Sequence, residues 1–304
     1  MKTAVFCGQG SQKLGMGNEL YYHVSRCRSI MDESERILGY SLKAIVFGDD
    51  PEILTDTSHA QPALFITGLM YAAALEEKGY RFRACAGHSL GEYTALVFAK
   101  SLSFEEGLQL VQKRGCAMKK AADGTGSMAA VIGFTPEELD SILVSYPKVQ
   151  IANINSDDQI VISGEKNELQ SAYQAIKSIN IPGRRVRVIP LKVSGPFHSR
   201  MMKTAQAEMR PYLQNATVQK PQIPVVMNVS GNPEEEPNCI RELLIRQIVE
   251  PVQWVKTLHS LAALGSFENI EIGPGNTLTG LSKKTQGAPN TIESDILLAP
   301  TGMV

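Results

Sequence analysis

The chain has 304 residues, a length that suits one large domain or a main domain with a smaller companion. Hydrophobic residues make up 43% and charged residues 20%, and the formal net charge is −1, which gives no overall field for nucleic acid or an anionic membrane. The five cysteines are odd in number and lack C-x-x-C spacing, so we expect neither a disulfide framework nor a metal site. The N-terminal apolar run is too short for a signal peptide and no stretch approaches a membrane span, so we expect a cytoplasmic protein, and nothing demands more than a monomer.

The first 126 residues predict the alternating strands and helices of an α/β protein. We expect strands over residues 4–7 and 81–86 and helices over residues 18–38, 63–78, 91–99 and 104–122. Pro62 is expected near the first helical position of its helix, where a missing N–H costs nothing. The glycine-rich loop over residues 8–12 has Lys13 where a dinucleotide-binding loop has its third glycine, which disfavours nucleotide binding.

Residues 127–193 have a different rhythm, in which strands outnumber helices. We expect strands over residues 128–134, 149–155, 159–163 and 184–191 and helices over residues 136–145 and 166–178. The order β-α-β-β-α-β is typical of a ferredoxin-like unit. We therefore expect a ferredoxin-like small subdomain over residues 127–193, inserted into an α/β-hydrolase-like main subdomain of residues 1–126 and 194–304 with a parallel sheet.

The last third of the chain predicts further elements of the main subdomain. We expect strands over residues 225–229 and 269–272 and helices over residues 201–213, 237–249, 251–264 and 278–284. The tail beyond Gln286 carries little pattern, so we expect it to be loose.

Residues 87–91 read Gly-His-Ser-Leu-Gly and lie between an expected strand and an expected helix. This strand-turn-helix context is typical of a nucleophile elbow, in which flanking glycines permit a sharp turn and the serine hydroxyl is exposed at a strand end. The following helix would point its N-terminus toward the same place, where backbone N–H groups can hold an oxyanion. The alternative is a serine in an ordinary turn, and the context favours Ser89 as a nucleophile.

A serine nucleophile needs a base, and His198 is the best candidate among the five histidines. His198 follows Ser89 in the chain and lies in a glycine- and proline-containing loop after a strand, which is the order found in elbow enzymes. His23 and His259 lie on expected helices, and His88 would point away from the adjacent serine. Several acidic residues lie between Ser89 and His198, and none stands out as a third member of a triad.

Several short motifs, each weak alone, occur together over nearly the whole chain, from residue 6 to residue 284. In this order they resemble the malonyl-CoA:acyl-carrier-protein transacylases, the acyltransferases of fatty-acid and polyketide synthesis. The motifs are Gly-Gln-Gly-Ser-Gln at 8–12, Gln-Pro-Ala at 61–63, the elbow and its extension at 87–93, Lys-Arg-Gly at 113–115, residues 126–131, Asn-Ile-Asn-Ser at 153–156, Phe-His-Ser at 197–199, residues 251–254 and Gly-Pro-Gly at 273–275.

The resemblance implies a role for five residues in catalysis. Ser89 would carry the acyl group as an ester, and His198 would serve as its base and as the acid for each leaving thiol. The side chain of Gln9 and the backbone N–H of Leu90 would form the oxyanion hole. Gln247 would orient the imidazole through its backbone carbonyl, which would explain why no triad carboxylate stands out.

Five further residues would bind the substrates. The resemblance implies that Arg114 grips the free carboxylate of malonate, for which a guanidinium offers two hydrogen bonds and a permanent charge. Asn155 would line the pocket, and Phe197 matches the form that selects malonyl over methylmalonyl. Lys283 and Lys284 match a basic pair that would face the acidic helix of the carrier protein.

The activity implied is transfer of malonyl from malonyl-CoA to the phosphopantetheine thiol of an acyl carrier protein through a Ser89 ester, with no permanently bound cofactor and a coenzyme A thioester as substrate. Two alternatives stay open: a hydrolase that removes acyl groups from carrier proteins, and a non-catalytic scaffold that binds carriers. Arg114 speaks against a hydrolase for uncharged acyl chains, and the presence of Ser89, His198 and Gln9 speaks against a scaffold. The sequence leaves open whether the carriers belong to fatty-acid or polyketide synthesis.

Overall fold

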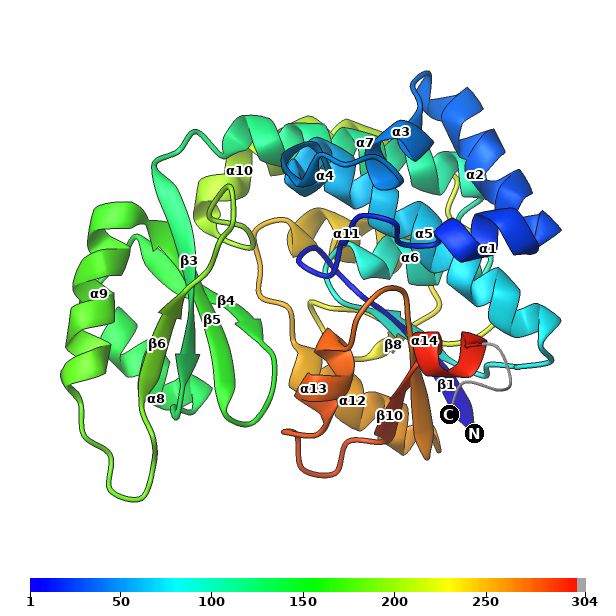
Figure 1. The fold of residues 1–304 in the computed structure, drawn as a ribbon. Coiled ribbons are helices and arrows are strands. Elements are labelled where there is room, and N and C mark those ends of the chain that lie inside the picture. Colours follow the sequence, from blue (N-terminus) through cyan, green and yellow to red (C-terminus); the bar gives the residue numbers. More distant parts are fainter. Residues whose placement is uncertain (300–304) are drawn as a thin grey trace.

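A computed structural model describes residues 1–299 and shows an α/β protein with two sheets (Figure 1). Among these residues, the larger sheet has six strands in the order β10-β9-β1-β2-β7-β8. They are β1 (Lys2–Phe6), β2 (Cys85–Gly87), β7 (Val225–Val226), β8 (Pro233–Glu234), β9 (Glu268–Ile272) and β10 (Asn290–Glu293). Neighbours from β10 to β7 pair in parallel, whereas the edge strand β8 runs antiparallel to β7.

Strand β1 lies inside the larger sheet, and its apolar side chains Ala4, Val5 and Phe6 are buried. A continuous apolar run of this kind is typical of a parallel strand that is covered by helices on both faces. Phe6 pairs with Gly87 of β2 and with Ile272 of β9, so these strands end level with one another. The loops that follow them therefore emerge at one edge of the sheet, where ligand sites of α/β proteins lie.

Helices surround the larger sheet (Figure 1). They are α1 (Asn18–His23), α2 (Ser25–Leu38), α3 (Leu42–Val46), α4 (Pro51–Thr55), α5 (Thr57–Glu77), α6 (Gly91–Phe98), α7 (Phe104–Ala121), α10 (Lys203–Asn215), α11 (Pro237–Gln247), α12 (Trp254–Ala263), α13 (Thr277–Ser282) and α14 (Ser294–Leu298), with a short 3-10 helix at Arg200–Met202. Helix α5 is apolar on every side and buried over residues 60–75, as expected for a helix enclosed by other elements.

The smaller sheet is antiparallel, with the strand order β4-β5-β3-β6, and packs against two helices. Its elements are β3 (Gly126–Ile132), α8 (Pro136–Leu143), β4 (Val149–Ile154), β5 (Gln159–Glu165), α9 (Lys166–Ser178) and β6 (Arg187–Pro190). Side chains alternate between its two faces. Ala129 and Val131 of β3 belong to a separate apolar cluster with α8 and α9, whereas Met128 and Ala130 join the main core.

Five predictions about secondary structure were wrong. The strands expected over residues 81–86 and 225–229 are only Cys85–Gly87 and Val225–Val226, because the two strands pair with each other over that short length alone. The helix expected over residues 18–38 is divided at Val24, whose backbone is extended, into α1 and α2. Pro62 lies inside α5 because Asp56 caps that helix earlier, accepting a hydrogen bond from the Ser58 N–H. The tail beyond Gln286 forms β10 and α14, since β10 gains a partner in β9; residues 300–304 lie outside the described part of the chain.

Within residues 1–299, none of the helices has the length and apolar character needed to span a bilayer.

Candidate active site

Ser89 lies in a sharp turn between β2 and α6, at the edge of the sheet where the parallel strands end. Its backbone has φ 51°, a left-handed conformation that residues other than glycine rarely adopt. The flanking glycines allow no side chain: a Cβ on Gly87 would collide with the backbone of Gly91, and a Cβ on Gly91 would collide with the carbonyl of Phe6. Close backbone packing thus forces the strained turn that presents the Ser89 hydroxyl.

His198 meets Ser89 as the sequence predicts, with its Nε2 2.8 Å from Ser89 Oγ. On the far side of the ring, His198 Nδ1 lies 2.8 Å from the backbone carbonyl oxygen of Gln247. Because a carbonyl can only accept, Nδ1 carries the proton and Nε2 is left free to accept the Ser89 proton. The ring is buried, and burial together with the positive charge of Arg114 lowers the pKa of His198 to about 3, so the imidazole is neutral at physiological pH.

Arg114 brings a buried positive charge to the same point. Its side chain is 1% exposed, and its Nη2 donates to Ser89 Oγ at 3.2 Å and to Gln247 Oε1 at 2.9 Å. Its Nη1 donates to Gln61 Oε1 at 2.7 Å, and its Nε has no hydrogen-bond partner among residues 1–299. All three of these partners are neutral, and burial lowers the pKa of the guanidinium. A buried cation with neutral partners is suited to an anionic ligand, because burying an unpaired charge is costly.

Beneath the elbow, the structure places two residues that the sequence did not point to, Asn228 and Glu92, in contact with the candidate site. Asn228 accepts a hydrogen bond from the Ser89 N–H at 2.7 Å and donates to the Gly87 carbonyl at 2.6 Å, so one side chain bridges the turn. Glu92 Oε2 accepts from Gln247 Nε2 at 2.6 Å, and Glu92 Oε1 accepts from the Asn228 N–H at 2.5 Å. Burial raises the pKa of Glu92 to about 8.

The sequence could have pointed to Asn228, because it is a polar residue at the end of a strand that was predicted to be buried. The signal for Glu92 was its place as an acidic residue in the first turn of a mostly apolar helix that follows the nucleophile. Gln247 links both to the rest of the site, since its Nε2 also donates to the Ser89 carbonyl at 2.8 Å. The resemblance implied a role for the backbone carbonyl of Gln247 alone, whereas its side chain also binds groups of the site.

The two expected oxyanion-hole groups come from the elbow and from the loop after β1. Leu90 is the N-cap residue of α6, so its N–H belongs to the N-terminus of that helix. Gln9 lies in the loop after β1, and its Nε2 donates to Thr57 Oγ1 at 3.1 Å. That loop rests on the elbow, because a Cβ on Gly8 would lie 2.5 Å from the His88 carbonyl oxygen.

The residues that were predicted to bind the substrates, other than Arg114, lie around the catalytic groups or on the surface. Asn155 Oδ1 is 2.9 Å from His88 Nε2, so Asn155 contacts the neighbour of Ser89 and His88 points away from the serine, as expected. Phe197 is buried beside His198. Lys283 and Lys284 are exposed at the end of α13, and Lys284 Nζ lies 3.9 Å from Asp158 Oδ2 in the loop between β4 and β5.

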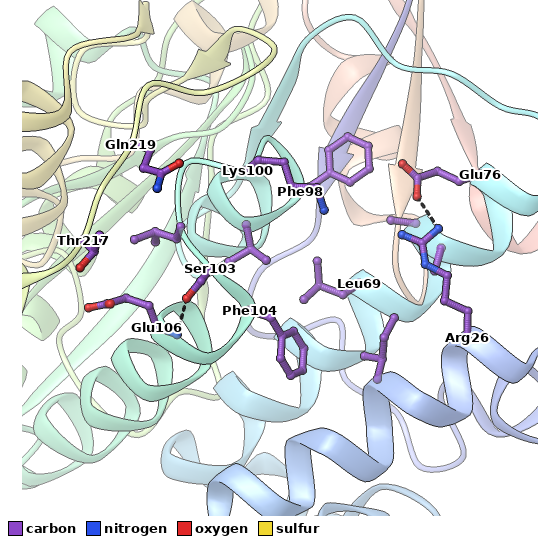
Figure 2. Close-up of a pocket in the computed structure, with 15 residues that line it drawn as sticks. Arg26, Leu69, Glu76, Phe98, Lys100, Ser103, Phe104, Glu106, Thr217 and Gln219 are labelled. Atoms are coloured by element: carbon purple, nitrogen blue, oxygen red, sulfur yellow. Dashed lines mark hydrogen bonds and ion pairs between the residues drawn. The ribbon is translucent and has the colours of Figure 1, made fainter.

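A separate cavity of about 560 Å³ is lined by residues of α2, α5, α6 and the start of α7, and none of the predicted site residues lines it (Figure 2). On its rim, Arg26 pairs with Glu76 at 2.8 Å. Over residues 1–299, no group of three or more His, Cys, Asp or Glu side chains is arranged to hold a metal ion.

The chain is similar to proteins of known activity over almost all of its length. Residues 3–299 match the model of the acyl transferase domain family. The chain is 40% identical over 293 residues to the malonyl CoA-acyl carrier protein transacylase of Bacillus subtilis (strain 168), covering 95% of this chain and 91% of the relative. It is 39% identical over 284 residues to the polyketide biosynthesis malonyl CoA-acyl carrier protein transacylase PksC of the same organism, covering 92% and 96%.

Solved structures that are similar to this chain are of the same kind of protein. The malonyl CoA-acyl carrier protein transacylase from Coxiella burnetii is 35% identical and superimposes with a TM-score of 0.92, covering 98% of this chain and 95% of that one. A malonyl-transacylase in complex with a type II PKS acyl-carrier protein is 36% identical, with a TM-score of 0.90, covering 96% and 95%. The chain belongs to the acyl transferase domain family, among its malonyl CoA-acyl carrier protein transacylases.

Proposed function

We propose that Ser89 carries a malonyl group, as an ester, from malonyl-CoA to the phosphopantetheine thiol of an acyl carrier protein, in fatty-acid or polyketide synthesis. The observation that carries this proposal is the guanidinium of Arg114, buried among neutral partners and 3.2 Å from the Ser89 hydroxyl. Malonyl is a short acyl group with a free carboxylate, so one end can meet the cation while its thioester carbon meets the serine.

The reaction has two matching halves. In the first, His198 Nε2 takes the Ser89 proton as Oγ attacks the thioester carbonyl, and the Gln9 amide and the Leu90 N–H hold the oxyanion that forms. The carbon–sulfur bond then breaks, and the coenzyme A thiolate leaves with the proton from His198. In the second half, His198 takes the proton of the carrier thiol, which attacks the ester, and returns that proton to Ser89 as the serine leaves.

The protein residues around His198 suit both halves. The Gln247 carbonyl holds the Nδ1 proton and stabilises the imidazolium that forms while the proton is on Nε2. The low pKa of His198 keeps Nε2 unprotonated and ready to accept. No bound cofactor takes part, because a thioester is reactive enough to acylate the serine, and the reaction exchanges one thioester for another of similar energy.

Arg114 would select the acyl group. The malonyl carboxylate replaces the Ser89 hydroxyl as a partner of the guanidinium, forming charge-assisted hydrogen bonds that also seat the thioester against Ser89. Phe197, buried beside the histidine, limits the space for a substituent on the malonyl methylene, where one methyl changes binding by about 1–3 kcal/mol. Asn155 acts indirectly, because it bonds the His88 ring beside Ser89.

The two sheets support a division of the chain, and most of the buried apolar side chains of residues 127–193 form a cluster of their own. We assign residues 1–126 and 194–304 to an α/β-hydrolase-like unit and residues 127–193 to a ferredoxin-like unit, and the strand order β4-β5-β3-β6 supports the latter. Lys283 and Lys284 lie where the two units approach, and we assign them to the surface that meets the acidic carrier protein.

A hydrolase that removes acyl groups from carriers would use the same serine and histidine. Arg114 argues against it, because a site for uncharged acyl chains gains nothing from a buried cation.

The test is incubation with radiolabelled malonyl-CoA, with the Ser89→Ala variant as control. We expect a label on Ser89 that is stable in buffer and passes to added carrier protein, and no label on the variant. Rapid loss of the label to water would instead show a hydrolase, and an unlabelled wild-type protein would overturn the proposal. Comparing transfer rates to a fatty-acid carrier and a polyketide carrier would then identify the pathway.

A further inference from the structure

Strand β4 of the smaller sheet reaches the loops that carry the candidate catalytic groups. It is an edge strand on the side of that sheet facing the larger unit (Figure 1). Its backbone pairs with Val252, with the Ile154 N–H donating to the Val252 carbonyl and the Val252 N–H donating to the Ala152 carbonyl, each at 2.9 Å. The segment that follows Gln247 is thus held by the smaller sheet.

Gln150, on the same strand, binds both sides of the His198–Gln247 pair. Its Nε2 donates to the His198 carbonyl at 3.3 Å and to the Val249 carbonyl at 3.2 Å. Its Oε1 accepts from the Arg200 N–H at 3.0 Å. Two carbonyls on one side and an N–H on the other fit a primary amide in one orientation only.

The His198 backbone needs such support. It has φ 54°, a left-handed conformation that costs a residue other than glycine about 1–3 kcal/mol and persists only where the surroundings enforce it. Gln150 bonds the carbonyl of this strained residue and the N–H two positions later, on either side of the turn. Neither atom belongs to the reacting groups.

We infer that Gln150 is a positioning residue for acyl transfer: it ties the His198 loop to the end of α11, so that Nε2 stays within reach of Ser89. The inference rests on the proposed function, and it gives the smaller unit a part in catalysis through the position of His198. A small displacement of the imidazole would weaken both of its hydrogen bonds, and a shift of about 1 Å can cost about 10²-fold in rate.

The first test is the Gln150→Met variant, which keeps the length of the side chain and removes its hydrogen bonds. We expect kcat for malonyl transfer to fall about 10- to 100-fold with little change in KM for malonyl-CoA. Labelling of Ser89 by a small organophosphonate, which needs only the serine and its base, should slow in the same proportion. Gln170→Met, on the exposed face of α9, is the matched control and should leave both rates unchanged.

The second variant, Gln150→Glu, keeps the acceptor for Arg200 and places a carboxylate oxygen against the two carbonyls. Its labelling rate relative to wild type should rise as the pH falls from 8 to 5 and the new carboxyl group gains a proton to donate. A purely structural role would give a constant ratio. Equal labelling rates for folded Gln150→Met and Gln170→Met, or a pH-independent ratio for Gln150→Glu, would overturn the inference. Because the labelling assay uses no malonyl-CoA, it separates failure of this inference from failure of the proposed function.

Discussion

At the scale of single residues, the candidate site combines a neutral base with a buried cation. His198 contacts the Ser89 hydroxyl through one ring nitrogen and the Gln247 carbonyl through the other, while Arg114 Nη2 donates to the same serine oxygen. Each group alters the others: the guanidinium disfavours a proton on the imidazole, and a substrate carboxylate bound to Arg114 would relieve that effect.

Replacing Arg114 with glutamine should change which thioester the protein accepts. The variant loses the charge that pairs with malonyl, while an uncharged acetyl thioester loses nothing comparable. We expect kcat/KM for malonyl-CoA to fall about 100-fold or more, since truncating one partner of a buried charge pair costs about 2–5 kcal/mol. The kcat/KM for acetyl-CoA should change far less, and an equal loss for both substrates would contradict a role in selection.

The same variant should alter the pH dependence of Ser89 reactivity. In the wild-type protein burial, and then Arg114, lower the pKa of His198 to about 3, so labelling of Ser89 should stay constant as the pH falls through 6.5, the usual value for histidine. Without the Arg114 charge the pKa of His198 rises, and labelling should begin to fall at a higher pH. The check is the organophosphonate labelling rate between pH 4 and 8 for both proteins, where identical profiles would rule out the electrostatic coupling.

At the scale of elements, the elbow depends on how closely α6 and β1 approach. Gly91 begins α6 directly against the carbonyl oxygens of Phe6 and Cys7 at the end of β1. The strain at Ser89 is sustained by this contact and by Asn228, which bridges both sides of the turn.

Gly91→Ala should therefore destabilise the protein strongly, by more than about 3 kcal/mol, because its methyl group would meet backbone atoms that cannot move aside. Gly280→Ala is the matched control: it lies in α13 with open space around the added Cβ, and it should be neutral or stabilising by up to about 1 kcal/mol. Urea denaturation measures both, and similar unfolding free energies would mean that the elbow is not so tightly packed.

At the scale of the whole molecule, two units meet around one site. The face of the smaller sheet that carries Met128 and Ala130 joins the main core, and β4 pairs with the segment after α11. Lys284 reaches Asp158 across the same boundary, which leaves Lys283 beside it exposed to a partner.

Reversing the charge of Lys283 should weaken transfer to the carrier without affecting the first half-reaction. We expect Lys283→Glu to lower kcat/KM for carrier protein several-fold at low salt, with the effect fading as ionic strength rises, because exposed charges are screened. Labelling of Ser89 by malonyl-CoA should be unchanged. Lys177→Glu, a charge reversal on the exposed face of α9, controls for net charge and should have no effect on either step.

The sequence by itself determined the elements that depend on neighbours in the chain. The alternating pattern predicted both sheets, and the spacing of Gly87, Ser89 and Gly91 predicted the turn, because a Cβ on Gly87 would collide with the Gly91 backbone within the turn itself. The order of the chain and its loop context pointed to His198, the family resemblance pointed to Arg114, and the structure brings both to Ser89. The tail after Gln286 was mistaken for a loose segment because β10 is stable only through its pairing with β9.

Only the tertiary structure decided how the site is held together. Asn228 lies 139 residues from Ser89 in the chain, and Gln150 lies 48 residues from His198, yet each bonds the backbone of its partner. A hydrogen bond between residues far apart in the chain produces no pattern in the sequence, because the packing of whole sheets and helices brings its partners together. The chemistry of the site can therefore be predicted from local motifs, whereas its rigidity is a property of the folded chain.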